Sequence, residues 1–273
     1  MPTNNIHWFS KTRALVGGIK TTGDEYIASI LSKYQKFTGV GSVAYNEHQI
    51  LFPVIKNWAK GFLLNVEFSG SYAKGTGVKG STDVDLFISL DPQTPGTLKE
   101  IYDSLYNYVA QNGYAPRRQN VSIGIKHNNL SVDLTPGKKQ AGNTNDHSIF
   151  RNKAQSWTQT NIQAHINLIK QSGRIDEIRT TKIWRNLNQL EFPSFYLELA
   201  VLEALSGRNR NQLATNVLTV LEYLRDSFVN SRIIDPANSN NVISDDLNSA
   251  EKQTIASAAS ISRNKSYWSE IIW

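Results

Sequence analysis

Two aspartates one residue apart, inside an apolar run, constrain this chain more than any other feature. The run reads DVDLFI over residues 83–88. Successive side chains of a β-strand point to opposite faces, so the pattern places Asp83 and Asp85 on one face and the apolar Val84, Leu86 and Ile88 on the other. The sequence therefore predicts a strand with one buried face and one face suited to holding cations.

A second strand and a turn precede the two aspartates. Residues 62–68, FLLNVEF, alternate in the manner of a strand and run into Gly70 and Ser71. This pair supplies a backbone turn without an obstructing side chain, exposed amides and a hydroxyl donor, which together suit phosphate groups. Lys74 and Lys79 add positive charge nearby. A Gly-Ser turn or an Asp-x-Asp pair alone is common and can be purely structural, whereas their combination is rarer.

A third aspartate lies in a predicted hairpin. Residues 121–125 and 130–134 alternate on either side of the polar turn HNN, and Asp133 projects opposite Val132 and Leu134. If this hairpin pairs with the 83–90 strand, three carboxylates face one another and repel unless divalent cations lie between them. Mg²⁺ fits, with Mn²⁺ as the alternative, because it takes oxygen ligands together with substrate phosphates. Two ions about 4 Å apart would support an in-line phosphoryl displacement, with Asp133 holding the metal that activates the attacking hydroxyl.

The two halves of the chain differ in their predicted structure. Residues 1–158 mix helices and strands, whereas residues 159–273 are predicted to be helical, so we expect an α+β protein of two lobes. Trp8 and Phe9 belong to an expected docking arm over residues 1–20. Helices are predicted from Asp24, over 42–60 with a kink or new start at Pro53, from Leu98 to Gly113, and at Ile162–Gly173, Ile175, Ser194–Gly207 and Leu213–Phe228. Residues 136–157 are expected to form a loop over the site, and Ser244, after a loop at 235–242, is expected to cap the last helix.

Three residues of the helical half are candidates for nucleotide contacts. Lys182 lies on the same helical stripe as Ile175 and Ile178, so it faces inward, and a buried lysine needs an anion. The alternative is a lysine whose stem covers apolar surface while its amine reaches solvent. Ser194 begins a helix, where free amides favour phosphate. Phe195 offers a face on which a base could stack, although such a residue is more often part of the core.

Composition excludes several classes of site and of protein. There is no cysteine, so disulfides and thiolate metal sites are excluded, and the five histidines are scattered, which argues against a zinc site. No apolar stretch approaches the roughly 20 residues of a membrane span, and the N-terminus lacks the apolar core of a signal peptide, so we expect a cytoplasmic protein without membrane contacts. The net charge of +6 attracts polyanions, either nucleotides or RNA.

The motifs together carry a family resemblance. The run GSYAKGTGVKGSTDVDLF resembles the signature of the DNA polymerase β-like nucleotidyltransferase superfamily. Within it, the chain is similar to the branch of class I CCA-adding enzymes, 2′-5′ oligoadenylate synthetases and cyclic GMP-AMP synthase, with the bacterial CD-NTases. The runs SVDLTP, KIWRNL and FPSFYLEL strengthen the resemblance, and DPANSNNV is similar to a loop of the oligoadenylate synthetase helical domain.

The resemblance implies a nucleotidyltransferase palm, a mixed sheet flanked by helices, packed against a C-terminal helical lobe with a cleft between them. It also implies that Gly70 and Ser71 bind a triphosphate, that Lys182 and Ser194 grip phosphates, and that the three aspartates bind two magnesium ions. Relatives usually have tyrosine where Phe195 stands, so either Phe195 or the adjacent Tyr196 is expected to stack on a base. The cysteines of the zinc insert that serves double-stranded DNA sensing are absent, and the chain has no room for tRNA-binding domains.

We therefore expect a CD-NTase-like enzyme that joins nucleoside triphosphates into a cyclic or linear oligonucleotide signal for a downstream effector. The role in bacterial antiphage defence comes from the resemblance alone. One alternative is a template-independent nucleotidyltransferase that extends an RNA 3′ end, as in tRNA, and another is a non-catalytic nucleotide-binding module. The sequence leaves open the bases, the linkage (2′-5′ or 3′-5′), the activating signal and the oligomeric state.

Overall fold

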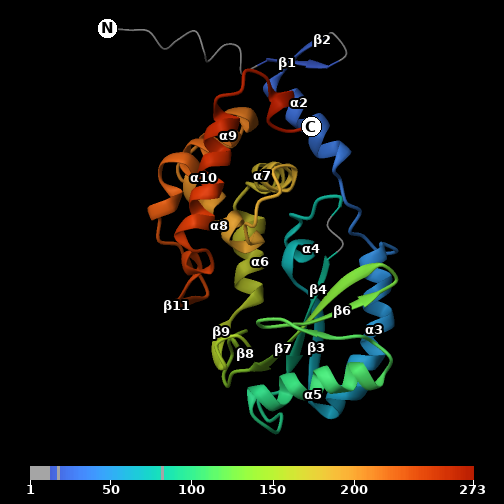
Figure 1. The fold of residues 1–273 in the computed structure, drawn as a ribbon. Coiled ribbons are helices and arrows are strands. Elements are labelled where there is room, and N and C mark those ends of the chain that lie inside the picture. Colours follow the sequence, from blue (N-terminus) through green and yellow to red (C-terminus); the bar gives the residue numbers. More distant parts are fainter. Residues whose placement is uncertain (1–12, 17–18, 81–82) are drawn as a thin grey trace.

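The computed structural model describes residues 13–16, 19–80 and 83–273. It has two lobes, a palm built on a mixed sheet and a lobe of helices packed beside it (Figure 1). The expected α+β class is therefore confirmed. The arm with Trp8 and Phe9 lies outside the described residues. None of the helices in the described part is both long and apolar enough to cross a membrane.

The palm sheet has the strand order β3-β4-β7-β6-β5, with β8 and β9 continuing from the end of β7. Strands β4 and β7 are parallel, whereas the other neighbours are antiparallel. The bounds are β3 (Leu63–Phe68), β4 (Asp83–Leu90), β5 (Arg117–Arg118), β6 (Ile123–His127), β7 (Leu130–Lys139), β8 (His147–Arg151) and β9 (Ser156–Thr160).

Two helices cover one face of this sheet and leave the aspartates on the other. Helices α3 (Val43–Ala59) and α5 (Leu98–Gln111) pack against Val84, Leu86 and Ile88, which are all buried. The period of two in DVDLFI thus sets the faces as predicted. Pro53 lies inside α3, which continues through it without a new start. The hairpin predicted over 121–134 is confirmed, with its first strand beginning at Ile123, and Asn128 and Asn129 both have the positive φ that a tight two-residue turn requires.

Two predictions about the connecting segments were wrong. Residues 136–157 do not form a loop, because β7 continues to Lys139 and β8 and β9 form a hairpin after it. Polar and glycine residues in that stretch concealed strands that are only partly buried. The last helix, α10 (Ser249–Arg263), begins at the cap Asn248 and not at Ser244, because Asn248 and Glu251 form a reciprocal capping box.

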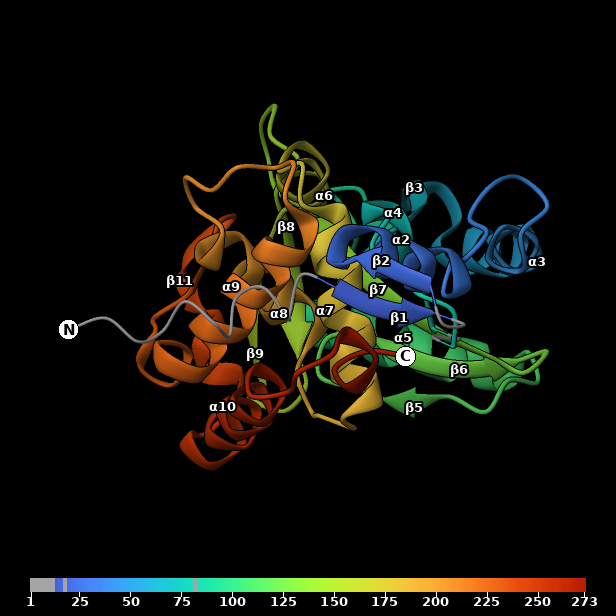
Figure 2. The ribbon, with the colours of Figure 1, turned by 90° about the horizontal axis from the view of Figure 1, so that it is seen from above.

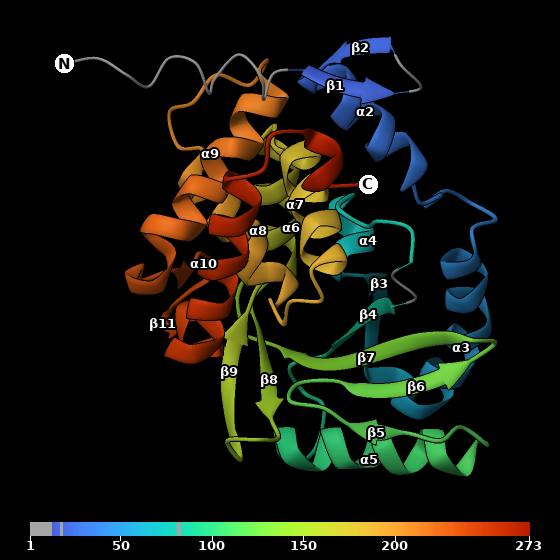
Figure 3. The same cartoon turned by 45° about the horizontal axis from the view of Figure 1, so that its top comes forward.

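The helical lobe forms its own core. Helices α6 (Ile162–Gln171), α7 (Ile175–Leu187), α8 (Ser194–Ala204), α9 (Leu213–Asp226) and α10 bury a continuous apolar cluster. Helix α2 (Gly23–Lys33) joins this core although it precedes the palm in sequence, and Figures 2 and 3 show it beside α7 and the C-terminus. The short elements are β1 (Arg13–Val16), β2 (Ile19–Thr22), α4 (Gly70–Lys74), β10 (Ile234–Asp235), β11 (Asn238–Val242) and 3₁₀ turns at 60–62, 228–230, 243–246 and 268–270.

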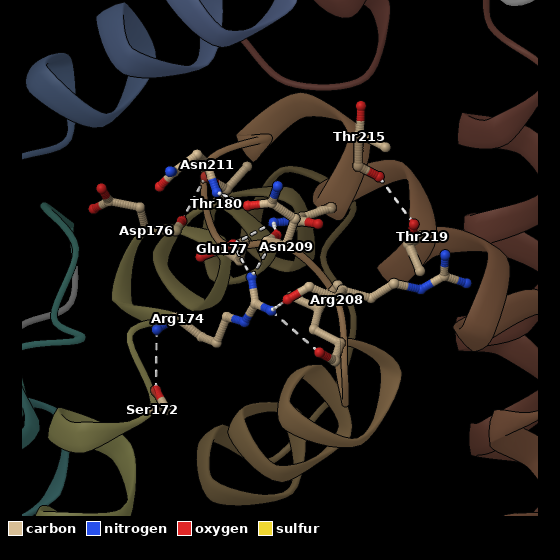
Figure 4. A network of polar contacts seen from close by, with 12 residues as sticks. Ser172, Arg174, Asp176, Glu177, Thr180, Arg208, Asn209, Asn211, Thr215 and Thr219 are labelled. Atoms are coloured by element: carbon tan, nitrogen blue, oxygen red, sulfur yellow. Dashed lines mark hydrogen bonds and ion pairs between the residues drawn. The ribbon is translucent and has the colours of Figure 1, made fainter.

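A buried arginine fixes the connection between α8 and α9. The Arg174 guanidinium donates to the carbonyl oxygens of Leu205, Arg208 and Asn209 and forms an ion pair of 3.0 Å with Glu177 (Figure 4). All of these acceptors belong to the helical lobe. This Arg174 cluster therefore stabilises the helical lobe internally.

Candidate active site

The pairing of β4 with β7 brings the acidic residues together. The strands are parallel and in register, so that Asp85 lies directly opposite Asp133, while Asp83 lies opposite Ser131. All three aspartates stand on the sheet face that α3 and α5 leave free. The predicted approach of the two carboxylate strands is thus confirmed.

Gly70, which follows β3, lies against Asp85 on the side opposite β7. It begins α4 with a φ of +53°, a conformation that glycine adopts readily. A Cβ built on Gly70 would overlap the carboxylate of Asp85. No other residue type fits here without moving the acid, so the Gly-Ser turn and the aspartate strand form a single local unit. Ser71 follows in the first turn of α4, half-buried, with its hydroxyl near Gly77.

Burial and nearby carboxylates raise the pKa of Asp133 and of Asp85. Burial is the main cause for Asp133, and the charges of Asp85 and Asp83 add to it, so that the pKa of Asp133 rises to about 6. Burial likewise raises the pKa of Asp85, against the attraction of Lys74, Lys182 and Lys36. Because ionisation of these carboxylates is unfavourable in the fold, the site is suited to a cation that neutralises them.

Gln119 holds the third carboxylate in place. Its side-chain amide donates to Asp133 Oδ1 at 2.8 Å and accepts from the Ser122 hydroxyl at 3.0 Å. Gly124, opposite Asp133 on β6, makes room for this contact, because a Cβ there would lie 2.5 Å from the Gln119 nitrogen. The sequence contains no signal for Gln119, since it lies in an irregular polar segment before β6.

A groove of about 590 Å³ opens beside Asp83. Its walls carry the cations Lys79 and Arg185 and the C-terminal end of α7. Lys36, from the connection between α2 and α3, is half-buried nearby, and burial lowers its pKa while Asp83 and Asp85 act to raise it. The groove thus joins the carboxylates to positive charge, which is the arrangement that a polyphosphate requires. The segment 35–42 has no periodicity, so sequence reasoning missed Lys36.

Lys182 is buried as predicted, and its counter-ion is a carboxylate of the protein itself. Its ammonium lies 2.6 Å from Glu198 Oε1 and 2.9 Å from the Thr76 hydroxyl. Lys74, from the palm, lies 2.5 Å from the other oxygen of Glu198, and Thr76 donates to Glu198 at 2.6 Å. These four side chains, here named the Glu198 cluster, are all buried and connect the two lobes.

Burial and neighbouring charges have opposite effects on the pKa values of Glu198 and Lys182. Burial works to raise the pKa of Glu198, but Lys182 and Lys74 outweigh it and hold that pKa below its usual value. Burial lowers the pKa of Lys182, and Glu198 opposes the decrease. Two ammonium groups share one carboxylate, so the cluster carries an excess positive charge next to Asp85 if all three groups are ionised.

Ser194 and Phe195 both lie at the start of α8. Ser194 is exposed, and its hydroxyl accepts from Arg185 at 3.0 Å. Phe195 is half-buried between the ring of His165, 4.4 Å away, and the Lys74 ammonium, 4.8 Å from the ring centroid. Tyr196 is completely buried among Phe192 and Phe228, so of the two aromatic residues only Phe195 has surface to offer a base.

The aspartates suit magnesium by their chemistry. Among the described residues, no three acidic or imidazole side chains already converge as the ligands of one ion. The donor set consists of hard carboxylate oxygens next to a glycine turn, and burial, together with the neighbouring carboxylates, raises the pKa of Asp85 and Asp133. Magnesium commonly binds one or two carboxylates and completes its shell with water and phosphate oxygens, so these residues fit it.

Comparison with known proteins gives matches at the level of structure. No family model matches the sequence, and no curated protein matches it. The Bradyrhizobium diazoefficiens CD-NTase CdnG in complex with GTP is 13% identical, with a TM-score of 0.76 over 89% of this chain and 91% of that one. E. coli CdnC with ATP is 20% identical, with a TM-score of 0.69 over 88% and 90%. The c-di-GMP synthase CdnE from Capnocytophaga granulosa is 15% identical, with a TM-score of 0.57 over 87% and 91%.

These similarities cover both lobes of the chain. The protein therefore has the fold of a CD-NTase-like nucleotidyltransferase. At this level of identity they show the fold alone, so the chemistry must be argued from the residues described above.

Proposed function

We propose that this protein is a nucleotidyltransferase that joins nucleoside triphosphates into a cyclic or linear oligonucleotide. The observation that carries the proposal is the in-register pair of Asp85 and Asp133 beside Gly70, a position where only glycine fits. The similar structures of CdnG with GTP and CdnC with ATP support triphosphates as substrates. A role in bacterial antiphage signalling would follow if an effector senses the product.

The reaction forms one phosphodiester and releases pyrophosphate. The acceptor hydroxyl oxygen bonds to the donor α-phosphorus, the bond from that phosphorus to the bridging oxygen breaks, and the hydroxyl proton passes to solvent. Magnesium, held by Asp83, Asp85 and Asp133, would supply charge stabilisation to the attacking and leaving oxygens. Gly70 and Ser71 offer amides and a hydroxyl to the leaving phosphates.

Residues from both lobes would supply the remaining contacts of the proposed site. Arg185 and Lys79 line the groove beside Asp83 and add positive charge for the polyphosphate. Lys182 would reach the phosphates from the Glu198 cluster, and Ser194 from the end of α8. Phe195, rather than the buried Tyr196, would contact the base.

Incubation with radiolabelled triphosphates and Mg²⁺ tests the proposal. We expect a phosphatase-resistant product that mass spectrometry identifies as a cyclic or linear oligonucleotide, and no product from Asp83→Asn/Asp85→Asn. Asp226→Asn, an exposed carboxylate of the helical lobe, serves as the control and should retain activity. Extension of an added RNA 3′ end would instead favour the RNA nucleotidyltransferase, and binding without turnover would favour a regulatory module.

A further inference from the structure

Arg117 lies on the same face of the sheet as the aspartates, at its far side. Asp85 pairs with Asp133, Asp133 with Gly124, and Gly124 with Arg117. This row crosses four neighbouring strands, and residues that pair directly share a face. The Cα atoms of Asp133 and Arg117 are thus two strand spacings apart, about 10 Å.

The side-chain amide of Gln119 lies over Gly124, between Asp133 and Arg117. A Cβ built on Gly124 would lie 2.5 Å from the Gln119 nitrogen, 3.2 Å from Asp133 Oδ1 and 3.4 Å from an Arg117 guanidinium nitrogen. The side chains of Asp133 and Arg117 therefore flank this amide from opposite sides. The positive charge of Arg117 also acts to lower the pKa of Asp133, after the larger effects of burial and the neighbouring carboxylates.

The Arg117 guanidinium has no partner of its own in the described part of the chain. It is exposed, and no hydrogen bond or ion pair to a described residue engages it. Its neighbour Arg118, although also exposed, forms an ion pair with Asp103 and lies over the Tyr106 ring at 4.2 Å. Of two consecutive arginines, one is thus engaged in structure and the other is available beside the site.

The direction of attack in the proposed reaction indicates which substrate lies near Arg117. Gly70 and Ser71 adjoin Asp85 on the β3 side, so the leaving phosphates of the proposed reaction lie there. An in-line displacement requires the attacking hydroxyl to approach from the opposite side, which is the side of Asp133 and Gly124. The acceptor therefore lies over β7, β6 and β5, outside the Gln119 amide, with its hydroxyl at Asp133.

Resting on the proposed function, we propose that Arg117 binds the 5′-phosphate group of an acceptor nucleotide whose hydroxyl lies at Asp133, two strands away. The planar guanidinium suits phosphate oxygens, which it contacts through two parallel N–H donors. The protein would then prefer acceptors that carry a 5′-phosphate to nucleosides. Removing the guanidinium should weaken acceptor use about tenfold or more and leave donor use unchanged.

The test separates donor from acceptor. A dideoxynucleoside triphosphate has no hydroxyl to attack with, so it acts as donor only, and a nucleoside, its monophosphate and its triphosphate are compared as acceptors. We expect wild-type protein to use the phosphorylated acceptors about tenfold better or more, and Arg117→Gln to reduce this preference to about twofold or less. The donor KM should stay unchanged, and Arg117→Lys should retain part of the preference.

Arg118→Gln is the matched control, because it removes the same charge one residue away and should keep the preference. An equal loss for Arg117→Gln with nucleoside and nucleotide acceptors, or an unchanged preference, would overturn the inference. If wild-type protein transfers no nucleotide from any donor, the proposed function fails and the inference fails with it. Unfolding midpoints should agree between wild type and Arg117→Gln, since the side chain is exposed.

Discussion

Glu177 and Glu198 are both buried carboxylates of the helical lobe, and each holds cations, but their surroundings differ. Glu177 binds one arginine, Arg174, and accepts from Asn216 at 2.8 Å. The remaining donors of Arg174 reach carbonyl oxygens of the same lobe (Figure 4). One positive charge meets one negative charge, and the network closes within one lobe.

Glu198 instead binds two lysines, one from each lobe. Both lysines also act on Asp85, where they oppose the rise in its pKa. Within the Glu198 cluster itself, two ammonium groups thus share one carboxylate, and Asp85 is the neighbouring negative charge. We therefore propose that the Arg174 cluster serves the stability of the helical lobe, whereas the Glu198 cluster also responds to an anionic ligand.

The largest effect is expected from Arg174→Met, which keeps the bulk and removes the charge. Glu177 would then be buried without its cation, and three carbonyl oxygens would lose their donor. We expect the free energy of unfolding to fall by about 3–5 kcal/mol, measured by urea denaturation. Turnover per folded molecule should not change, and no phosphate ligand should restore stability. Restoration by tripolyphosphate would contradict the contrast between the two clusters.

Glu198→Gln should have the next largest effect, a loss of about 2–3 kcal/mol at pH 7. The lysines would lose their counter-charge, but here tripolyphosphate or a nucleoside triphosphate should restore stability, raising the unfolding midpoint more than in wild type. Burial already lowers the pKa of Lys182, and Glu198 opposes that decrease. Without Glu198 the fold would favour the neutral amine further.

The pH dependence of the Glu198→Gln variant follows from this. A lysine whose pKa is lower in the folded than in the unfolded state destabilises the fold as pH falls below the unfolded value. The variant should therefore regain stability between pH 7 and pH 10, more than wild type does, in urea denaturation at several pH values. A variant as stable as wild type at pH 7, or one insensitive to both ligand and pH, would show that Glu198 does not neutralise the lysines.

Asp133→Asn should act in the opposite direction and stabilise the metal-free protein. The pKa of Asp133 is about 6 in the fold against about 3.9 in an unfolded chain, so stability is lost as pH rises between these values. We expect a gain of about 1–2 kcal/mol at pH 7.5, reduced by solvent screening, and none at pH 4. Urea denaturation in EDTA measures it. Magnesium should narrow the difference in stability between the variant and wild type, because it binds the wild-type carboxylates. A variant less stable than wild type at pH 7.5 would show that the ionised Asp133 does not destabilise the fold.

Much of the sheet face that carries the three aspartates could be predicted, because it depends on local patterns. The period of two in DVDLFI and SVDLTP fixes which face each aspartate takes, and the polar turn fixes the hairpin. The partner of Lys182 could not be predicted, because Glu198 lies in FYLELAVL, where nothing local marks it as buried against lysines from two lobes. Its meeting with Lys74 depends on how the lobes pack.

Dependence on packing between distant segments also explains why Lys36 and Arg117 were missed and why residues 136–157 were wrongly predicted as a loop. Lys36 and Arg117 reach the aspartates from segments without periodicity, and only the sheet register aligns Arg117 with Asp133. Strand β9 is polar and partly exposed, and β8 is short with Ile149 and Phe150 adjacent, so neither shows clear alternation, although the pairing of β8 with β7 and of β9 with β8 stabilises them. Local sequence thus predicts faces and turns, whereas contacts between distant segments come from the packing.

Thr76→Val gives the smallest effect and the finest test of the contrast between the two clusters. Thr76 donates to Glu198 and accepts from Lys182, so valine removes both hydrogen bonds while keeping the shape. We expect a loss of about 1 kcal/mol, seen as a small decrease of the urea midpoint. Because both charges remain, a triphosphate should stabilise this variant as much as wild type, in contrast to Glu198→Gln. A larger gain from the ligand in Thr76→Val would mean that hydrogen bonding rather than excess charge makes the Glu198 cluster responsive to phosphate.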